Sequence, residues 1–161
     1  MYRYISAFIA LSFCCFAPSG TIAQRSLAVD CPIEHAIKLS QPQWKLTEIF
    51  VRKNSEEDFV IFRWHSGPEQ VSAQVSEYET SAKAAESLQF SVKMISMGSY
   101  SKLNTIGDES YLYEEVNSYR KELTKWRIIF RKGKGVITLE APTLELAKSF
   151  SRSIADSLPA A

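Results

Sequence analysis

A plan of strand, tight turn, strand and helix occurs twice in this chain, and it constrains the fold more than any other feature. The second copy is IIFRKGKGVITLEAPTLELAKSF at residues 128–150, and the first is VIFRWHSGPEQVSAQVSEYETSAKAAESL at residues 60–88. In the second copy Gly133 and Gly135 suit the turn, because glycine adopts the positive φ values that tight hairpins require. Two such units supply strands for one sheet and helices to cover it, so the repeat predicts an α+β fold with one shared core.

Runs of residues with period two predict the strands of this sheet. The run FVIFRWH at 59–65 is almost continuously apolar, as in a central strand, whereas residues 70–79 alternate Val71, Ala73 and Val75 with polar neighbours. Such alternation is typical of a half-buried antiparallel strand. We therefore expect a six-stranded, mainly antiparallel sheet with two amphipathic helices, in a pseudo-repeat of βββα. The strands are expected at residues 44–52, 59–65, 70–79, 110–116, 123–131 and 135–141.

The last helix has the clearest amphipathic pattern in the chain. Pro142 ends the preceding strand, and Thr143 follows as a residue type that caps helices. Fully burying a Leu or Phe contributes about 1.5 to 3 kcal/mol, so the apolar stripe alone could hold this helix on the sheet. The stripe consists of Leu146, Ala147, Phe150, Ile154 and Leu158.

The first helix is expected from residue 81 to about residue 95, with Thr80 or Ser81 as its cap. The segment SYSKLNTIGDE after it, at residues 99–109, is expected to be a loop or a short edge strand. An exposed apolar patch on the outer side of this helix would be a candidate interface. One side of the helix carries Ala85, Leu88, Val92 and Ile95, and the opposite side carries Phe90, Met94 and Met97.

The first 23 residues have the build of a secretory signal peptide. Arg3 precedes an uncharged twelve-residue run, ISAFIALSFCCF, and the small residues TIA stand before Gln24. The run is shorter than the about 20 residues that a membrane-spanning helix needs, so we expect no transmembrane helix in the mature chain. The sequence thus predicts a secreted or periplasmic protein, with a surface segment at residues 24–42 and a single α+β domain at residues 43–161.

Charge and cysteine content narrow the classes of partner. The chain has 19 basic and 18 acidic residues, and the loss of Arg3 with the signal peptide makes these numbers equal. This balance excludes nucleic acid as an expected partner. Cys31 is the only cysteine left after removal of the signal peptide, so its thiol is expected to be either buried and inert or exposed and able to link to another chain.

The overall order of segments resembles a known group of proteins. IKLSQPQWKL, followed by strands, a helix, a strand led by glycine, a hairpin and a terminal helix, is similar to the PsbP-like α/β/α sandwiches. That group includes photosystem extrinsic subunits and secreted bacterial lipoproteins. The resemblance implies an accessory or binding protein rather than an enzyme, and it places no functional residue.

Motifs for common chemistries are missing from the sequence. It has no Gly-x-Ser-x-Gly, no His-Glu-x-x-His, and no glycine loop at a strand-to-helix junction. Three pairs of carboxylates are expected to be solvated sheet edges, and adjacent strand residues such as Glu114 and Glu115 point to opposite faces. The pairs are Glu77 with Glu79, Asp108 with Glu109, and Glu114 with Glu115.

One enzymatic alternative remains open. Thiolate, carboxylate and imidazole groups of Cys31, Glu34, His35 and His65 could hold zinc or copper, or serve a small hydrolase. The other interpretation of these residues is a set of surface side chains without a metal. We predict no catalytic residue, no cofactor and no metal.

The aromatic residues of the expected strands suggest a binding surface. If the helices cover only one face of the sheet, some of these rings are exposed, and Tyr, Trp and Arg are enriched at interfaces. The alternative is that the N-terminal segment covers the second face. The candidate surface comprises Phe59, Arg63, Trp64, His65, Tyr111, Tyr113 and Trp126.

Taken together, these features predict a non-catalytic binding or accessory module that is secreted or periplasmic. Its expected partner is an envelope protein. The alternatives are a small metal-dependent or hydrolytic enzyme that uses His35 or His65, and a carrier of a small apolar ligand between helix and sheet.

Overall fold

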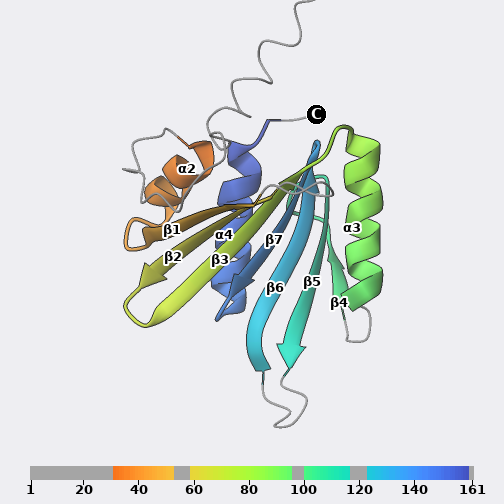
Figure 1. Cartoon of the computed structure of the whole chain (residues 1–161). Helices are drawn as coiled ribbons and strands as arrows, with labels where there is room; N and C mark the ends of the chain where they lie inside the picture. The colour runs from red at the N-terminus through yellow and green to blue at the C-terminus, as the bar shows by residue number, and fades with distance from the viewer. Residues whose placement is uncertain (1–30, 53–58, 96–99, 117–122, 160–161) are drawn as a thin grey trace, which may run out of the picture.

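The computed structural model describes residues 31–52, 59–95, 100–116 and 123–159. Within these ranges the chain forms three helices and seven strands (Figure 1). The expected signal peptide at residues 1–23 lies outside them. The helices are α2 (Pro32–Ser40), α3 (Ser81–Ile95) and α4 (Leu144–Ser157). The strands are β1 (Lys45–Arg52), β2 (Phe59–Ser66), β3 (Glu69–Glu77), β4 (Tyr100–Leu103), β5 (Glu109–Val116), β6 (Leu123–Lys132) and β7 (Gly135–Ala141).

The strands form one antiparallel sheet in the order β1-β2-β3-β7-β6-β5-β4. Each half of the chain contributes an antiparallel meander, and the two meanders meet where β3 pairs with β7. The α+β class and the antiparallel sheet predicted from the sequence are confirmed. The repeated plan therefore has a physical role, because its two copies join at the centre to complete one sheet.

The expected counts of six strands and two helices are wrong. β4 is a strand that pairs with β5, but its four residues are too few to show a period of two. α2 is a helix with buried residues inside residues 24–42, where the sequence predicted only a surface segment. Pro32 begins α2, as its fixed φ suits a first turn, and Ile33 and Ile37 are buried one turn apart. The second half is thus ββββα, and α2 precedes the first half.

α2 and α4 cover one face of the sheet, which we call the α4 face (Figure 1). The core beneath them contains three aromatic rings in contact. The ring centroid of Phe150 lies 5.4 Å from that of Trp44 and 5.5 Å from that of Trp64. The expected cap of α4 is confirmed, since Thr143 Oγ1 accepts a hydrogen bond from the backbone N–H of Leu146 at 3.3 Å.

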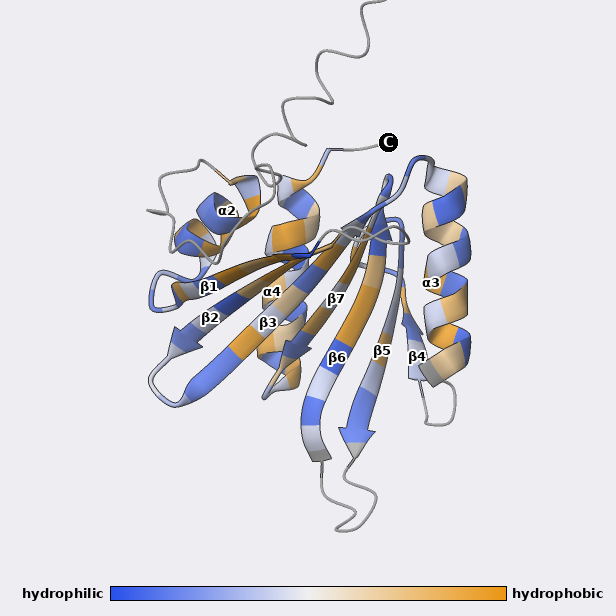
Figure 2. Ribbon diagram, viewed as in Figure 1, coloured by the Kyte–Doolittle hydropathy of each residue, from blue (hydrophilic) through white to orange (hydrophobic). Residues whose placement is uncertain are grey.

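α3 covers the opposite face, the α3 face, where it packs on β6 and β7. The apolar stretch of β6 is orange in Figure 2 and is buried on both sides. Ile128 and Phe130 enter the core of the α4 face, whereas Ile129 enters the smaller core under α3. That smaller core consists of Ala84, Leu88, Val92, Tyr111, Tyr113, Ile129 and Val136.

The limits of α3 agree with the prediction from the sequence. Thr80 Oγ1 accepts a hydrogen bond from the backbone N–H of Lys83 at 3.1 Å, so Thr80 serves as the cap. Phe90 and Met94 are exposed on the outer side, as that pattern suggested. Met97 lies outside the described ranges. No helix in the described part of the chain is long and apolar enough to cross a membrane.

The hairpin between β6 and β7 needs only one of its two glycines in a special conformation. Gly133 has a φ of 57°, in the left-handed region that favours glycine. Gly135 is the first residue of β7 and is not among the glycines with positive φ. The prediction for the turn is therefore correct at Gly133 and wrong at Gly135.

Candidate interaction surface

One part of the α3 face has no described helix packed over it. α3 packs on β6 and β7, whereas β1 and β2 lie beyond β3 on the other side of the sheet centre. Side chains on this part of the face are partly or fully exposed, and none belongs to the core cluster under α3. We call this surface the open face. It consists of Glu48, Phe50, Phe59, Ile61, Arg63, His65, Ser72 and Gln74.

A line of opposed residues begins on the open face and continues across the whole sheet, passing under α3 at Tyr113. Opposed residues in neighbouring strands project from the same face, so their side chains are neighbours. Polar and charged types dominate this line. Its members, from β1 to β4, are Glu48, Arg63, Ser72, Glu140, Arg127, Tyr113 and Tyr100.

At one end of this line Glu48 and Arg63 form an ion pair. Both side chains are substantially exposed, so the pair contributes little to the free energy of folding. Phe50 and Ile61 lie opposite each other in the adjacent pair of β1 and β2. The open face therefore places a charged pair beside an apolar pair.

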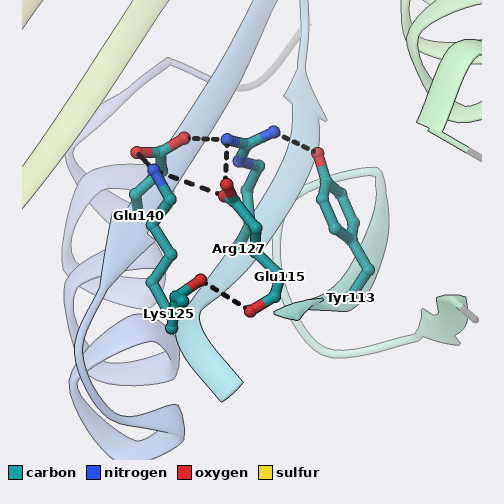
Figure 3. A network of polar contacts seen from close by, with 6 residues as sticks. Tyr113, Glu115, Lys125, Arg127 and Glu140 are labelled. Atoms are coloured by element: carbon teal, nitrogen blue, oxygen red, sulfur yellow. Dashed lines mark hydrogen bonds and ion pairs between the residues drawn. The ribbon is translucent and has the colours of Figure 1, made fainter. Parts of the chain in front are cut away.

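Further along the same line, five side chains form the polar network of Figure 3. Arg127 Nη2 lies 3.0 Å from Glu115 Oε2 and also pairs with Glu140. Lys125 Nζ lies 2.6 Å from Glu140 Oε2 and 3.3 Å from Glu115 Oε2. Arg127 Nη1 donates a hydrogen bond to the hydroxyl oxygen of Tyr113 at 3.2 Å. Two cations and two carboxylates are thus held together by β5, β6 and β7.

Burial and pairing shift the pKa values in this network in a consistent way. Burial raises the pKa of Glu140, but the hydrogen bond from Lys125 and the charge of Arg127 outweigh burial, so the pKa lies below its ordinary value. Burial lowers the pKa of Arg127, yet Tyr113 and the two carboxylates raise it above its ordinary value. Burial also raises the pKa of Tyr113. At neutral pH the network therefore holds ionised Glu140 and Arg127 beside a protonated Tyr113 hydroxyl.

The balance of charge limits what this surface can recognise. The carboxylates of Glu115 and Glu140 are offset by Lys125 and Arg127, and Glu48 is offset by Arg63. Such a surface favours a partner that carries both charges and apolar groups over a polyanion.

The seven aromatic and charged residues proposed from the sequence do not form one surface. Phe59, Arg63 and His65 belong to the open face. Trp64 and Trp126 point to the α4 face, where Trp64 is buried and Trp126 is partly buried against the core. The remaining two, Tyr111 and Tyr113, are buried under α3.

Because side chains alternate along a strand, the sequence already places Arg63 and Trp64 on opposite faces of the sheet. Which residues of neighbouring strands lie next to them depends on strand pairing. Phe50 was not proposed, because the position of β1 at the edge of the sheet depends on a strand order that the sequence does not give. Arg127 and Glu140 were missed because they are distant in sequence and become neighbours only through the pairing of β6 with β7. The turn expected at KGKG predicts that hairpin, but the register that sets Arg127 opposite Glu140 depends on which residues form the turn.

The residues of the enzymatic alternative are not brought together. His35 lies on α2, which packs on the α4 side, whereas His65 is on the α3 face of β2. Cys31 is only 4 % exposed at the start of α2, as in the buried interpretation of its thiol, and an interchain link would require this end to move. Among the described residues, no three His, Cys, Asp or Glu side chains form a group that could hold a metal ion.

Only some of the residues in the three acidic pairs are solvated, as the sequence predicted for all of them. Glu77, Glu79 and Glu114 are exposed, as expected. Asp108 is exposed as well, but it accepts hydrogen bonds at 2.8 Å from both Arg131 Nη1 and the backbone N–H of Gly133. Asp108 thereby ties the turn before β5 to the hairpin between β6 and β7. Only the remaining two, Glu109 and Glu115, are partly buried, and they are paired through Tyr111 and Arg127.

The side chains of the two cores occupy the space between the helices and the sheet. Side chains from α4, β2 and the segment before β1 meet at ring-contact distances on the α4 face, and α3 packs directly on apolar side chains of β6 and β7. The arrangement resembles an ordinary protein core, with side chains as the packing partners of both helices.

No family model and no curated protein sequence matches the chain. Among solved structures, the chain is similar to a GTP binding regulator from Thermotoga maritima, with 13 % sequence identity and a TM-score of 0.47. The match covers 77 % of this chain and 87 % of that chain. At this level of similarity, no function is assigned from it.

Proposed function

We propose that this protein is a non-catalytic binding or accessory module, secreted or periplasmic, that binds an envelope protein through its open face. The observation that carries the proposal is the uneven cover of the sheet. α3 packs on β6 and β7, while the α3 face of β1, β2 and β3 lies outside both core clusters. Phe50 is 47 % exposed on that surface.

The chemistry of the open face supports a protein as the partner. Phe50, Phe59 and Ile61 provide apolar contact area, and Arg63 and Glu48 provide both signs of charge beside it. Interfaces between proteins combine such an apolar centre with a polar surround. The resemblance to the PsbP-like group, whose members are mostly accessory or binding proteins, supports the same role.

Residues 1–23 support the proposed location, and this part of the proposal has its own test. Cells that produce the full chain are fractionated, and the mass of the protein is measured in each fraction. We expect a chain that begins at Gln24, recovered outside the cytoplasm. A chain that retains Met1 and stays in the cytoplasm would contradict export.

Site-specific photo-cross-linking in the same cells tests the binding surface. A photoreactive residue at position 74 lies on the open face, and the matched control is position 152, which is exposed on α4. We expect a cross-link to a different protein from position 74 only. The substitution Arg63→Glu should weaken that cross-link, because it removes the positive charge from the open face. A cross-linked product from position 152 and none from position 74 would contradict the proposal.

A further inference from the structure

β1 is an edge strand of the sheet, and the side chains at its centre are apolar and exposed. It pairs with β2, and no other strand of the described chain pairs with it. Ile49, Phe50 and Val51 are 36 %, 47 % and 38 % exposed. The unpaired N–H and C=O groups of an edge strand can bind a further strand, and apolar side chains favour that pairing.

The two edges of the sheet differ chiefly in length, since β1 also carries a lysine, Lys45, at its first position. β4 has only four residues and includes Lys102, and short strands with lysine are common ways to block pairing at an edge. β1 has eight residues. Its register with β2 shifts between Leu46 and Glu48, but from Glu48 to Arg52 the pairing is regular. That half of β1 is therefore an ordinary extended strand with an apolar centre.

The sequence of β1 is complementary to itself when two copies run antiparallel. With Phe50 opposite Phe50 of the second copy, Ile49 lies opposite Val51. In the same register Glu48 lies opposite Arg52 on both sides of the Phe50 pair. Opposite charges and apolar side chains directly across an antiparallel pair are stabilising.

Only this register pairs the charges. The α3 faces of the two copies stay on the same side of the joined sheet only if the register changes by two residues at a time, because side chains alternate between faces. A slip in one direction places Glu48 opposite Phe50, and a slip in the other places Phe50 opposite Arg52. In both cases Glu48 loses its cationic partner across the interface.

We infer that two copies of this chain associate through β1, antiparallel, with Phe50 on the twofold axis. The association joins two seven-stranded sheets into one continuous sheet. It also brings the two open faces side by side, because Glu48, Phe50 and Arg52 project from the same face as Arg63 and Ile61. The dimer stands on the geometry of β1 and is independent of the proposed function.

Charge reversal at β1 tests the inference in the full mature chain. Sedimentation equilibrium, with reductant present to exclude a disulfide at Cys31, measures the dimer dissociation constant. Glu48→Arg faces Arg52 of the second copy with a like charge, and Arg52→Glu faces Glu48 likewise. Each single substitution changes two symmetric pairs, so we expect the dissociation constant to rise about tenfold or more.

The double variant Glu48→Arg with Arg52→Glu re-forms both pairs with exchanged signs, and we expect it to restore the dimer. Arg152→Glu, a charge reversal at an exposed position of α4, is the matched control and should leave the dissociation constant unchanged. Circular dichroism of each variant verifies that the chain is folded. A wild-type chain that stays monomeric, single variants that dimerise like the wild type, or a double variant that stays monomeric would each overturn the inference.

Discussion

The two faces of the sheet differ in both cover and composition. The α4 face lies under α2 and α4, and in its core the ring of Phe150 contacts the rings of both Trp44 and Trp64. The α3 face has a smaller core at β6 and β7 and a polar, partly exposed surface over β1, β2 and β3. The difference suggests a division of roles, in which one face provides most of the stability and the other is available for recognition.

β2 shows this division within a single strand. Val60, Phe62 and Trp64 are buried in the core of the α4 face, while Ile61 and Arg63 between them are partly exposed. Both sets of residues have the same backbone and the same neighbours in sequence. What differs is only the face of the sheet to which they point.

The largest expected effect is the loss of Phe150. Phe150→Ala removes a fully buried ring that contacts Trp44 and Trp64, and it should lower the free energy of unfolding by about 3 to 5 kcal/mol. Urea denaturation followed by tryptophan fluorescence measures the change. Phe90→Ala, at an exposed position of α3, should change it by less than about 0.5 kcal/mol. Equal losses for the two variants would contradict the assignment of the main core.

A smaller loss is expected under α3. Leu88→Ala removes a buried side chain from the core of the α3 face and should cost about 2 to 3 kcal/mol. The cost is smaller because a single helix over part of a face can shift to fill the space. Met94→Ala, on the exposed side of the same helix, is the matched control for the urea experiment. A loss larger than that of Phe150→Ala would reverse the comparison between the two faces.

The smallest effect is a dependence on pH at the polar network. The pKa of Glu140 is lowered from 4.5, so its ionised form stabilises the fold; this contribution is complete above about pH 4.5 and is lost as the pH falls through the lower, folded-state value. Glu140→Gln should therefore be less stable than the wild type at pH 7 and should approach it in acid. Urea titrations at several pH values measure the difference.

A matched change of an exposed carboxylate controls for general effects of charge on that titration. Glu114→Gln alters the residue beside Glu115 on β5, where the side chain is exposed. Its stability should follow that of the wild type at every pH. If Glu140→Gln also runs parallel to the wild type from pH 7 into acid, the pairing of Glu140 with Lys125 and Arg127 does not stabilise the fold.

Much of the local structure could be predicted from the sequence. β7 has the expected limits, β2 differs by one residue, and α3 and the cap of α4 are as expected. These features follow from side-chain periodicity and from residue types at helix ends, which act over a few positions. β4 was predicted only as one of two alternatives, a short edge strand or a loop, and α2 was not predicted, because a four-residue strand and a nine-residue helix offer little periodic signal.

The sequence by itself determined the class of fold, the antiparallel strands, the amphipathic stripe of α4 and the signal-like character of residues 1–23. The tertiary structure alone decided that β3 pairs with β7 and that α3 and α4 lie on opposite faces. The physical reason is the range of the interactions. Periodicity is written into neighbouring residues, whereas the order of strands and the cover of each face depend on contacts between segments far apart in the chain.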